Sequence, residues 1–177
     1  MRFLSEESVL RHKEYFRGLK LKYSVLEKSY PEIRGLELGE IYRARIDSDA
    51  REESLSLFTK IMMHDLYFNS FCDELHNSVP VRESFGSEAN FLYEIELEIS
   101  QHEASGFLLI FFDRKKRLKF KILEGFSEIL LSSAPVLALD LYEHAYFSDY
   151  GFDRKRYVKS ALSHLNLNKI NDFCKTY

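Results

Sequence analysis

Tryptophan is absent from this 177-residue chain, and cysteine and proline are scarce, with two and three copies. Cys72 and Cys174 stand far apart and form no pair with the spacing of a metal site, which excludes a cysteine-based metal motif. So few cysteines suit a reducing compartment, and we expect a cytoplasmic protein.

Long apolar runs and an excess of positive charge are missing as well. No apolar run approaches the ~20 residues of a membrane-spanning helix, and the acidic N-terminal stretch Met1–Glu7 resembles neither a signal peptide nor a transit peptide. The net charge is −3, whereas nucleic-acid binding normally requires a basic face. We therefore expect no membrane partner and no nucleic-acid partner.

The residues that are present describe a globular protein, with 45% apolar and 30% charged side chains. In the first half, two amphipathic helices are predicted, one between Ser5 and Pro31 and one over about 49–75. Each apolar stripe has a histidine in its middle, His12 in the first and His64 in the second. One such histidine alone is most simply a core residue with a single hydrogen bond. The apolar residues that recur at three- and four-residue spacing are Val9, Phe16, Leu19, Tyr23, Leu26, Leu57, Ile61, Phe68, Phe71 and Leu75.

The second half mixes helices with short strands. A crossing segment over 77–82, which contains Pro80, precedes a helix that ends near His102. The fold class is α+β: an N-terminal antiparallel helical hairpin, residues 1–82, packs on a C-terminal α/β domain, residues 83–177, with a three-stranded antiparallel sheet. We expect its three strands over 106–112, 118–123 and 136–140. Two helices are expected after them, over 154–165 and 168–174.

An acid and a histidine stand together at the end of the third predicted strand. Asp140 closes an apolar run and His144 follows four residues later, so both side chains can point at one spot. Carboxylate oxygen and imidazole nitrogen together suit iron, manganese or zinc. With His12 and His64 also on inward faces, burying all four without a shared partner would cost on the order of several kcal/mol.

Five stretches of the chain resemble the iron/manganese superoxide dismutase family. The sequence DLYEHAYF over 140–147 is similar to that family's D-x-W-E-H-A-Y-Y, and the likeness continues over 149–157. Residues 63–71, MHDLYFNSF, resemble its N-H-x-x-Y-W-N-x-L, and 84–91 resemble its F-G-S-x-x-x-F. Residues 5–12 resemble the segment that leads to its first ligand.

The resemblance implies a single ion of iron or manganese per chain, held by His12, His64, Asp140 and His144. It also implies superoxide as the substrate, which one-electron cycling of the metal converts to oxygen and hydrogen peroxide without an organic cofactor. For a five-coordinate ion, four protein ligands leave one position for solvent or substrate, which is the catalytic pattern.

Positions around these ligands depart from the family pattern. The family's gateway tyrosine falls on Lys20 and a further histidine on Phe16, while its solvent-binding glutamine falls on Lys60 or near Phe126. Lys20 is either a solvent-facing charge or a lysine near the mouth that attracts superoxide.

Two tyrosines complete the candidate catalytic residues. Tyr67, three residues after His64, is our choice for a hydroxyl near the metal, with packing alone as the alternative. We expect Tyr142 to form a wall of the metal pocket. Glu143 and Tyr146 match family residues, and the resemblance implies that Glu143 bridges to the ligand histidine of a partner subunit. A twofold homodimer follows as an expectation.

Three functions are open on these grounds: a metal-dependent superoxide dismutase, a non-redox metal-binding relative, and an interaction protein on the same scaffold. The complete ligand set and the acidic net charge argue against the third. The replaced residues around the ligands keep the second open. A hydrolase is disfavoured, because no general base is placed beside the ligands.

Overall fold

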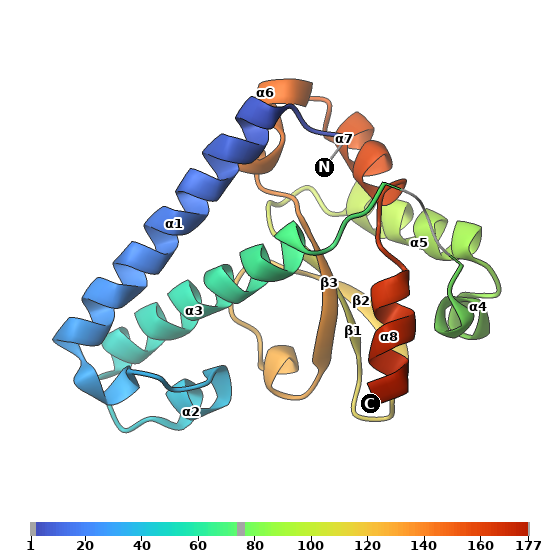
Figure 1. Ribbon diagram of the computed structural model, residues 1–177. Coiled ribbons are helices and arrows are strands. Elements are labelled where there is room, and N and C mark those ends of the chain that lie inside the picture. Colours follow the sequence, from blue (N-terminus) through green and yellow to red (C-terminus); the bar gives the residue numbers. More distant parts are fainter. Residues whose placement is uncertain (1–2, 74–76, 177) are drawn as a thin grey trace.

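The computed structural model describes residues 3–73 and 77–176, and Figure 1 shows a helical part beside a part built on a small sheet. The α+β fold class is confirmed. The helices are α1 (Glu6–Ser29), α2 (Leu38–Arg43), α3 (Ser48–Phe68), α4 (Val79–Phe85), α5 (Glu88–Gln101), α6 (Phe147–Tyr150), α7 (Arg154–Leu162) and α8 (Asn168–Thr176).

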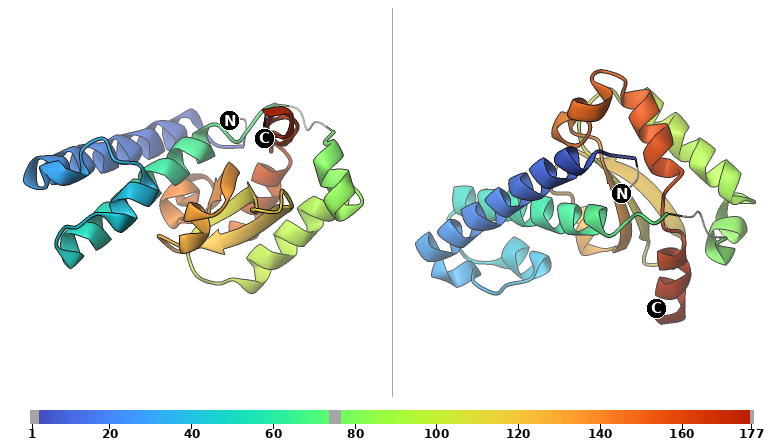
Figure 2. Two further views of the ribbon diagram at one scale, coloured as in Figure 1. Left: turned by 90° about the horizontal axis from the view of Figure 1, so that it is seen from below. Right: turned by 45° about the horizontal axis from the view of Figure 1, so that its top comes forward.

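The first helix forms where its end signals predict. The Ser5 side chain accepts a hydrogen bond from the backbone N–H of Ser8, acidic residues occupy the first turn, and the helix ends just before Pro31. α1 packs along α3 as an antiparallel pair, and Figure 2 shows the two helices side by side. His12 and His64 lie on the buried faces of this pair.

The second helix is shorter than predicted: α3 ends at Phe68, and Leu75 lies outside the described residues. Beyond the helix the chain pairs with the C-terminal region, where Cys72 N–H donates to the His164 carbonyl at 2.9 Å. Ser70 also bonds to β3, because its Oγ accepts from the buried N–H of Ala138 at 2.8 Å. These long-range bonds replace the helical ones that local sequence favours.

The sheet has three antiparallel strands, as predicted, and the structure orders them β2-β1-β3. The central strand β1 (Phe107–Phe112) is buried along its whole length, while β2 (Leu118–Leu123) alternates at its start, with Lys119 and Lys121 exposed. In β3 (Ala134–Asp140), the last residue pairs with Phe107 at the start of β1. α3 packs across β3, which brings the helical pair to the strand end where Asp140 lies.

A helix replaces the crossing segment predicted over 77–82. α4 begins at Val79, with the Ser78 side chain as its cap and a proline in its first turn. Ser78 and Pro80 thus start a helix here, where the proline alone predicts a break.

One hydrophobic core joins the two parts of the molecule. Its cluster contains Met63 and Tyr67 from α3 together with every residue of β1 and most of β3. The division into residues 1–82 and 83–177 therefore stays a prediction. Within 3–73 and 77–176, none of the helices combines the length and apolar character needed to cross a membrane.

Candidate metal centre

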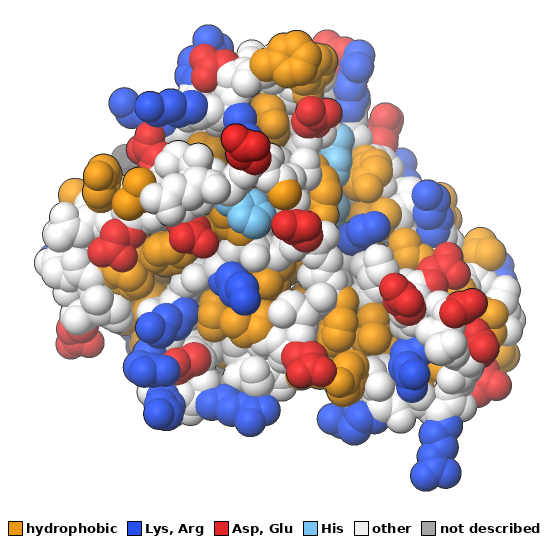
Figure 3. All heavy atoms as spheres, turned by 180° about the vertical axis from the view of Figure 1, so that it is seen from behind, with side chains coloured by type: hydrophobic (Ala, Val, Ile, Leu, Met, Phe, Trp, Pro, Cys, Tyr) orange, Lys and Arg blue, Asp and Glu red, His pale blue; other side chains and the backbone are white. Residues whose placement is uncertain are grey.

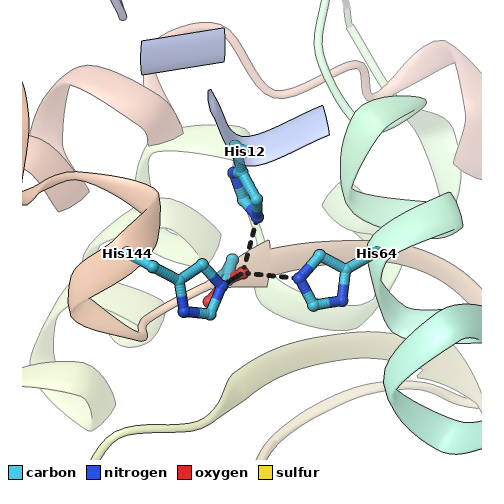
Figure 4. A group of neighbouring side chains, drawn as sticks. His12, His64 and His144 are labelled. Atoms are coloured by element: carbon cyan, nitrogen blue, oxygen red, sulfur yellow. Dashed lines mark hydrogen bonds and ion pairs between the residues drawn. The ribbon is translucent and has the colours of Figure 1, made fainter. Parts of the chain in front are cut away.

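Four side chains that are far apart in the sequence meet at one point, as Figure 4 shows. The Oδ2 atom of Asp140 lies 3.1 Å from Nε2 of His12, 3.5 Å from Nε2 of His64 and 3.1 Å from Nε2 of His144. One ligand atom from each residue falls within 4.8 Å of all the others. The structure thus brings together all four residues that the sequence proposes as metal ligands.

Asp140 is held from two sides at the end of β3. The buried Tyr157 hydroxyl donates to the Asp140 backbone carbonyl at 2.7 Å, and the Tyr142 backbone N–H donates to Oδ1 at 2.9 Å. The second bond turns the carboxylate so that Oδ2 faces the three imidazoles. The strand end and the turn after it therefore fix the carboxylate orientation before any ion is bound.

The carboxyl group of Asp140 is fully buried, yet its charged form is favoured. Burial by itself raises the pKa of Asp140, but the neighbouring His12 and His144 rings outweigh this effect and the net pKa is lowered. An ionised carboxylate surrounded by ring nitrogens is suited to a cation.

His64 presents a bare nitrogen to the cluster. Its Nδ1–H donates to the Lys60 carbonyl at 2.7 Å, and a carbonyl can only accept, so Nε2 carries the lone pair. Burial lowers the pKa of His64 to about 4. The Asp140 charge and the hydrogen bond to the Lys60 carbonyl each raise this pKa, but by less than burial lowers it. The ring is therefore neutral near pH 7, which is the form that binds a metal.

Several polar atoms of the cluster are buried without a hydrogen bond. Both ring nitrogens of His12 and Nε2 of His64 have no hydrogen-bond partner among the described residues, although the two Nε2 atoms lie close to Asp140. Such atoms are costly in a core unless something satisfies them. Ligand atoms that share one ion at ~2.0–2.2 Å lie about 3–4 Å from one another. Three imidazoles and one carboxylate at these separations fit an iron or manganese ion.

Aromatic rings enclose the ligands. Phe16 stacks on His64 at 5.6 Å between centroids, and Phe107 meets the same ring edge-on at 5.1 Å. Tyr67 and Phe68 pack on His12 at 4.9 and 5.0 Å. The phenylalanines supply an apolar wall, which strengthens electrostatic interactions inside it.

The structure places the three candidate catalytic residues differently. The Tyr67 ring contacts His12, and its buried hydroxyl lies beside that of Tyr157 without a well-formed hydrogen bond. Burial raises the pKa of Tyr67. The Tyr142 ring stacks on His144 at 5.6 Å, while its hydroxyl donates to the Glu124 carbonyl at 2.8 Å. Lys20 is exposed, with Nζ 4.1 Å from the centre of the Phe16 ring.

Phe126, one of the two positions matched to the family glutamine, packs against Tyr42 and makes no ring contact with the cluster. Lys60 contacts the cluster through its backbone carbonyl, which accepts from His64 Nδ1–H and which any residue could supply.

Sequence reasoning missed two side chains at this centre. Tyr157 holds the Asp140 backbone, and Tyr15 lies over the His144 and His64 rings. Tyr15 follows His12 by three residues, a spacing that puts both on adjoining faces of α1, so helical geometry could have identified it. Burial and the Asp140 charge raise the pKa of Tyr15.

Comparison with known proteins bears on the second half of the chain above all. Residues 73–173 match the family model described as the C-terminal domain of iron/manganese superoxide dismutases. The chain belongs to the iron/manganese superoxide dismutase family. The matched region contains Asp140 and His144 but neither His12 nor His64, so the convergence of all four is a finding of the structure.

Relatives in this family carry either metal in their names. An iron superoxide dismutase of rice chloroplasts (Oryza sativa subsp. japonica) is 35% identical over 88 residues, which are 48% of this chain and 34% of the relative. A manganese superoxide dismutase of Halobacterium salinarum is 38% identical over 88 residues, 49% of this chain and 43% of the relative. An iron superoxide dismutase of Plasmodium falciparum is 28% identical over 136 residues, covering 71% of this chain and 69% of the relative. The chain thus spans less than half the length of the first two.

Proposed function

We propose that this chain is a superoxide dismutase that uses one iron or manganese ion, held by His12, His64, Asp140 and His144. The observation that carries the proposal is the set of buried ring nitrogens without hydrogen bonds that lie within 3.5 Å of the buried Asp140 carboxylate, Nε2 of His12 and Nε2 of His64. Relatives named for iron and for manganese support either metal.

The reaction consumes two superoxide ions and two protons and yields one oxygen and one hydrogen peroxide. A bound iron or manganese ion supplies the one-electron chemistry, since it can cycle between two oxidation states. The chain's own task is to hold the ligands in place. Tyr142 N–H orients the Asp140 carboxylate, and the Lys60 carbonyl sets the tautomer of His64.

We propose separate roles for the candidate catalytic residues. Lys20 adds positive charge at the exposed end of Phe16, which favours the approach of an anion. Tyr67 keeps its proton and packs the His12 ring in place, and Tyr142 supports the His144 ring. The two tyrosines thus act from rings that contact the ligands, and Lys20 acts from the far side of Phe16.

We also propose a homodimer. The His144 side chain is 30% exposed, and its Nδ1 has no hydrogen-bond partner in the described part of the chain. Glu143, the residue before it, is exposed. In the proposed dimer, the Nδ1–H of His144 donates a hydrogen bond to the carboxylate of Glu143 of the partner subunit. Tyr146 is only 7% exposed and stacks on Tyr157, so its part in such a contact is limited to one edge.

A second candidate function is metal binding without dismutation. Lys20 and Phe16 stand where the resembling family has a tyrosine and a histidine, and the Phe126 ring packs on Tyr42. A cytoplasmic location, which rests on the small number of cysteines, also remains our proposal.

The test measures bound metal and superoxide removal on the same purified chain. We expect about one iron or manganese per chain from the family pattern, and superoxide decay that the variant Asp140→Asn abolishes together with the metal. Metal without superoxide removal would select the second candidate. A metal content equal in Asp140→Asn and the parent chain would rule out the centre described above.

A further inference from the structure

One of the four ligand side chains reaches solvent and the other three are buried. The side chains of His12 and Asp140 are 0% exposed and that of His64 is 1% exposed, whereas His144 is 30% exposed. Histidine side chains reach the surface on the face seen in Figure 3. A small molecule that approaches the four ligand atoms from solvent therefore has its shortest route along the His144 ring.

Tyr15 lies on that route. Its ring centroid is 4.3 Å from that of His144, at an interplanar angle of 33°, and 5.5 Å from that of His64. The Tyr15 side chain belongs to the boundary with solvent, since the residue is 43% exposed. It thus contacts the most open ligand and one of the most buried ligands at once.

The position of Tyr15 on α1 is rigid. The residue is one helical turn beyond the ligand His12, in a helix of 24 residues. A helix holds a side chain more precisely than a loop does, and a tyrosine ring has few rotamers to lose. Contact with the rings of two ligands also restricts how those imidazoles can turn.

We propose that Tyr15 is the gate of the metal centre: its ring orients His144 and restricts access to anions of two or three atoms. The proposal rests on the proposed function in so far as the four residues hold a metal ion. It assigns to Tyr15 the role of a positioning and specificity residue, exerted by the ring rather than the hydroxyl.

The experiment uses the iron-loaded full chain and three variants. Tyr15→Ala removes the ring, Tyr15→Phe keeps the ring without the hydroxyl, and Tyr93→Ala is the matched control at an exposed tyrosine on α5. Iron absorption is titrated with azide, a three-atom anion, and with benzoate, which is wider. The rate at which EDTA removes the iron is measured in parallel.

We expect the parent chain, Tyr15→Phe and Tyr93→Ala to bind azide and exclude benzoate. Tyr15→Ala should bind both and lose iron to EDTA about tenfold faster, the scale on which groups that orient a metal ligand act. Rescue by phenylalanine separates the ring from the hydroxyl.

Two results would overturn the gate: benzoate binding by the parent chain, or Tyr15→Ala behaving as Tyr93→Ala does. Failure to load iron at all would overturn both the gate and the metal centre. If the gate pattern appears without superoxide removal, the gate stands and only the dismutase proposal fails, so the two failures are distinguishable.

Discussion

The two halves of the ligand cluster are built in opposite ways. Asp140 and His144 lie four residues apart, and hydrogen bonds within the same corner of chain aim the carboxylate. His12 and His64 come from separate helices and reach the centre only because α1, α3 and β3 pack together. A short motif can thus predict two of the four ligands of a metal site, while the position of the other two depends on tertiary packing.

The largest expected effect is on stability, which should fall more when a histidine is removed from the helical half of the ligand cluster than from the strand-end half. In the metal-free chain, His64→Ala empties a buried position packed by Phe16 and Phe107 and should lower the free energy of unfolding by about 3 kcal/mol. His144→Ala, at a partly exposed ring, should cost about 1 kcal/mol. Urea unfolding measures both.

Metal content is the internal control for that pair, because both variants remove a ligand and should lose the ion alike. Equal destabilisation by the two substitutions would show that His144 is packed as tightly as His64, and that the two halves of the ligand cluster do not differ in packing.

A smaller loss of stability should follow when the hydrogen bond between the chain after α3 and β3 is removed. Ser70→Ala removes the acceptor of the buried Ala138 N–H, two residues before Asp140, and should cost about 1–3 kcal/mol. Ser100→Ala is the matched control, since the Ser100 hydroxyl is exposed and donates to the Leu97 carbonyl within α5. If thermal unfolding gives the same change for both variants, the bond does not tie α3 to β3.

The smallest effect concerns the exposed rim. Lys20→Ala removes one positive charge near the entrance and should lower the rate of superoxide removal by roughly twofold at low salt. The difference should shrink as ionic strength rises, because salt screens exposed charges. Lys22→Ala, also exposed on α1, serves as control. A loss that salt leaves unchanged would point to packing of Lys20 on Phe16 instead.

Sequence reasoning reached most of the fold because its signals were local. Ser5 and Pro31 bound α1 in the structure as in the prediction, and the three strands lie where apolar runs predicted them. It failed where long-range bonds override local preference: the chain leaves α3 at Phe68 to pair with residues near His164. It also overlooked α4, although Ser78 is a recognisable helix cap.

The amino-acid sequence by itself determined most of the helices, the three strands and the four ligand side chains, because periodicity, caps and a four-residue spacing are properties of neighbouring residues. Only the tertiary structure decided that His12 and His64 both face the Oδ2 of Asp140, and that the Tyr15 ring contacts His144 and His64 whereas Lys20 contacts Phe16. Those relations depend on how α1 and α3 lie against β3, and packing of distant surfaces is not written in any one stretch of chain.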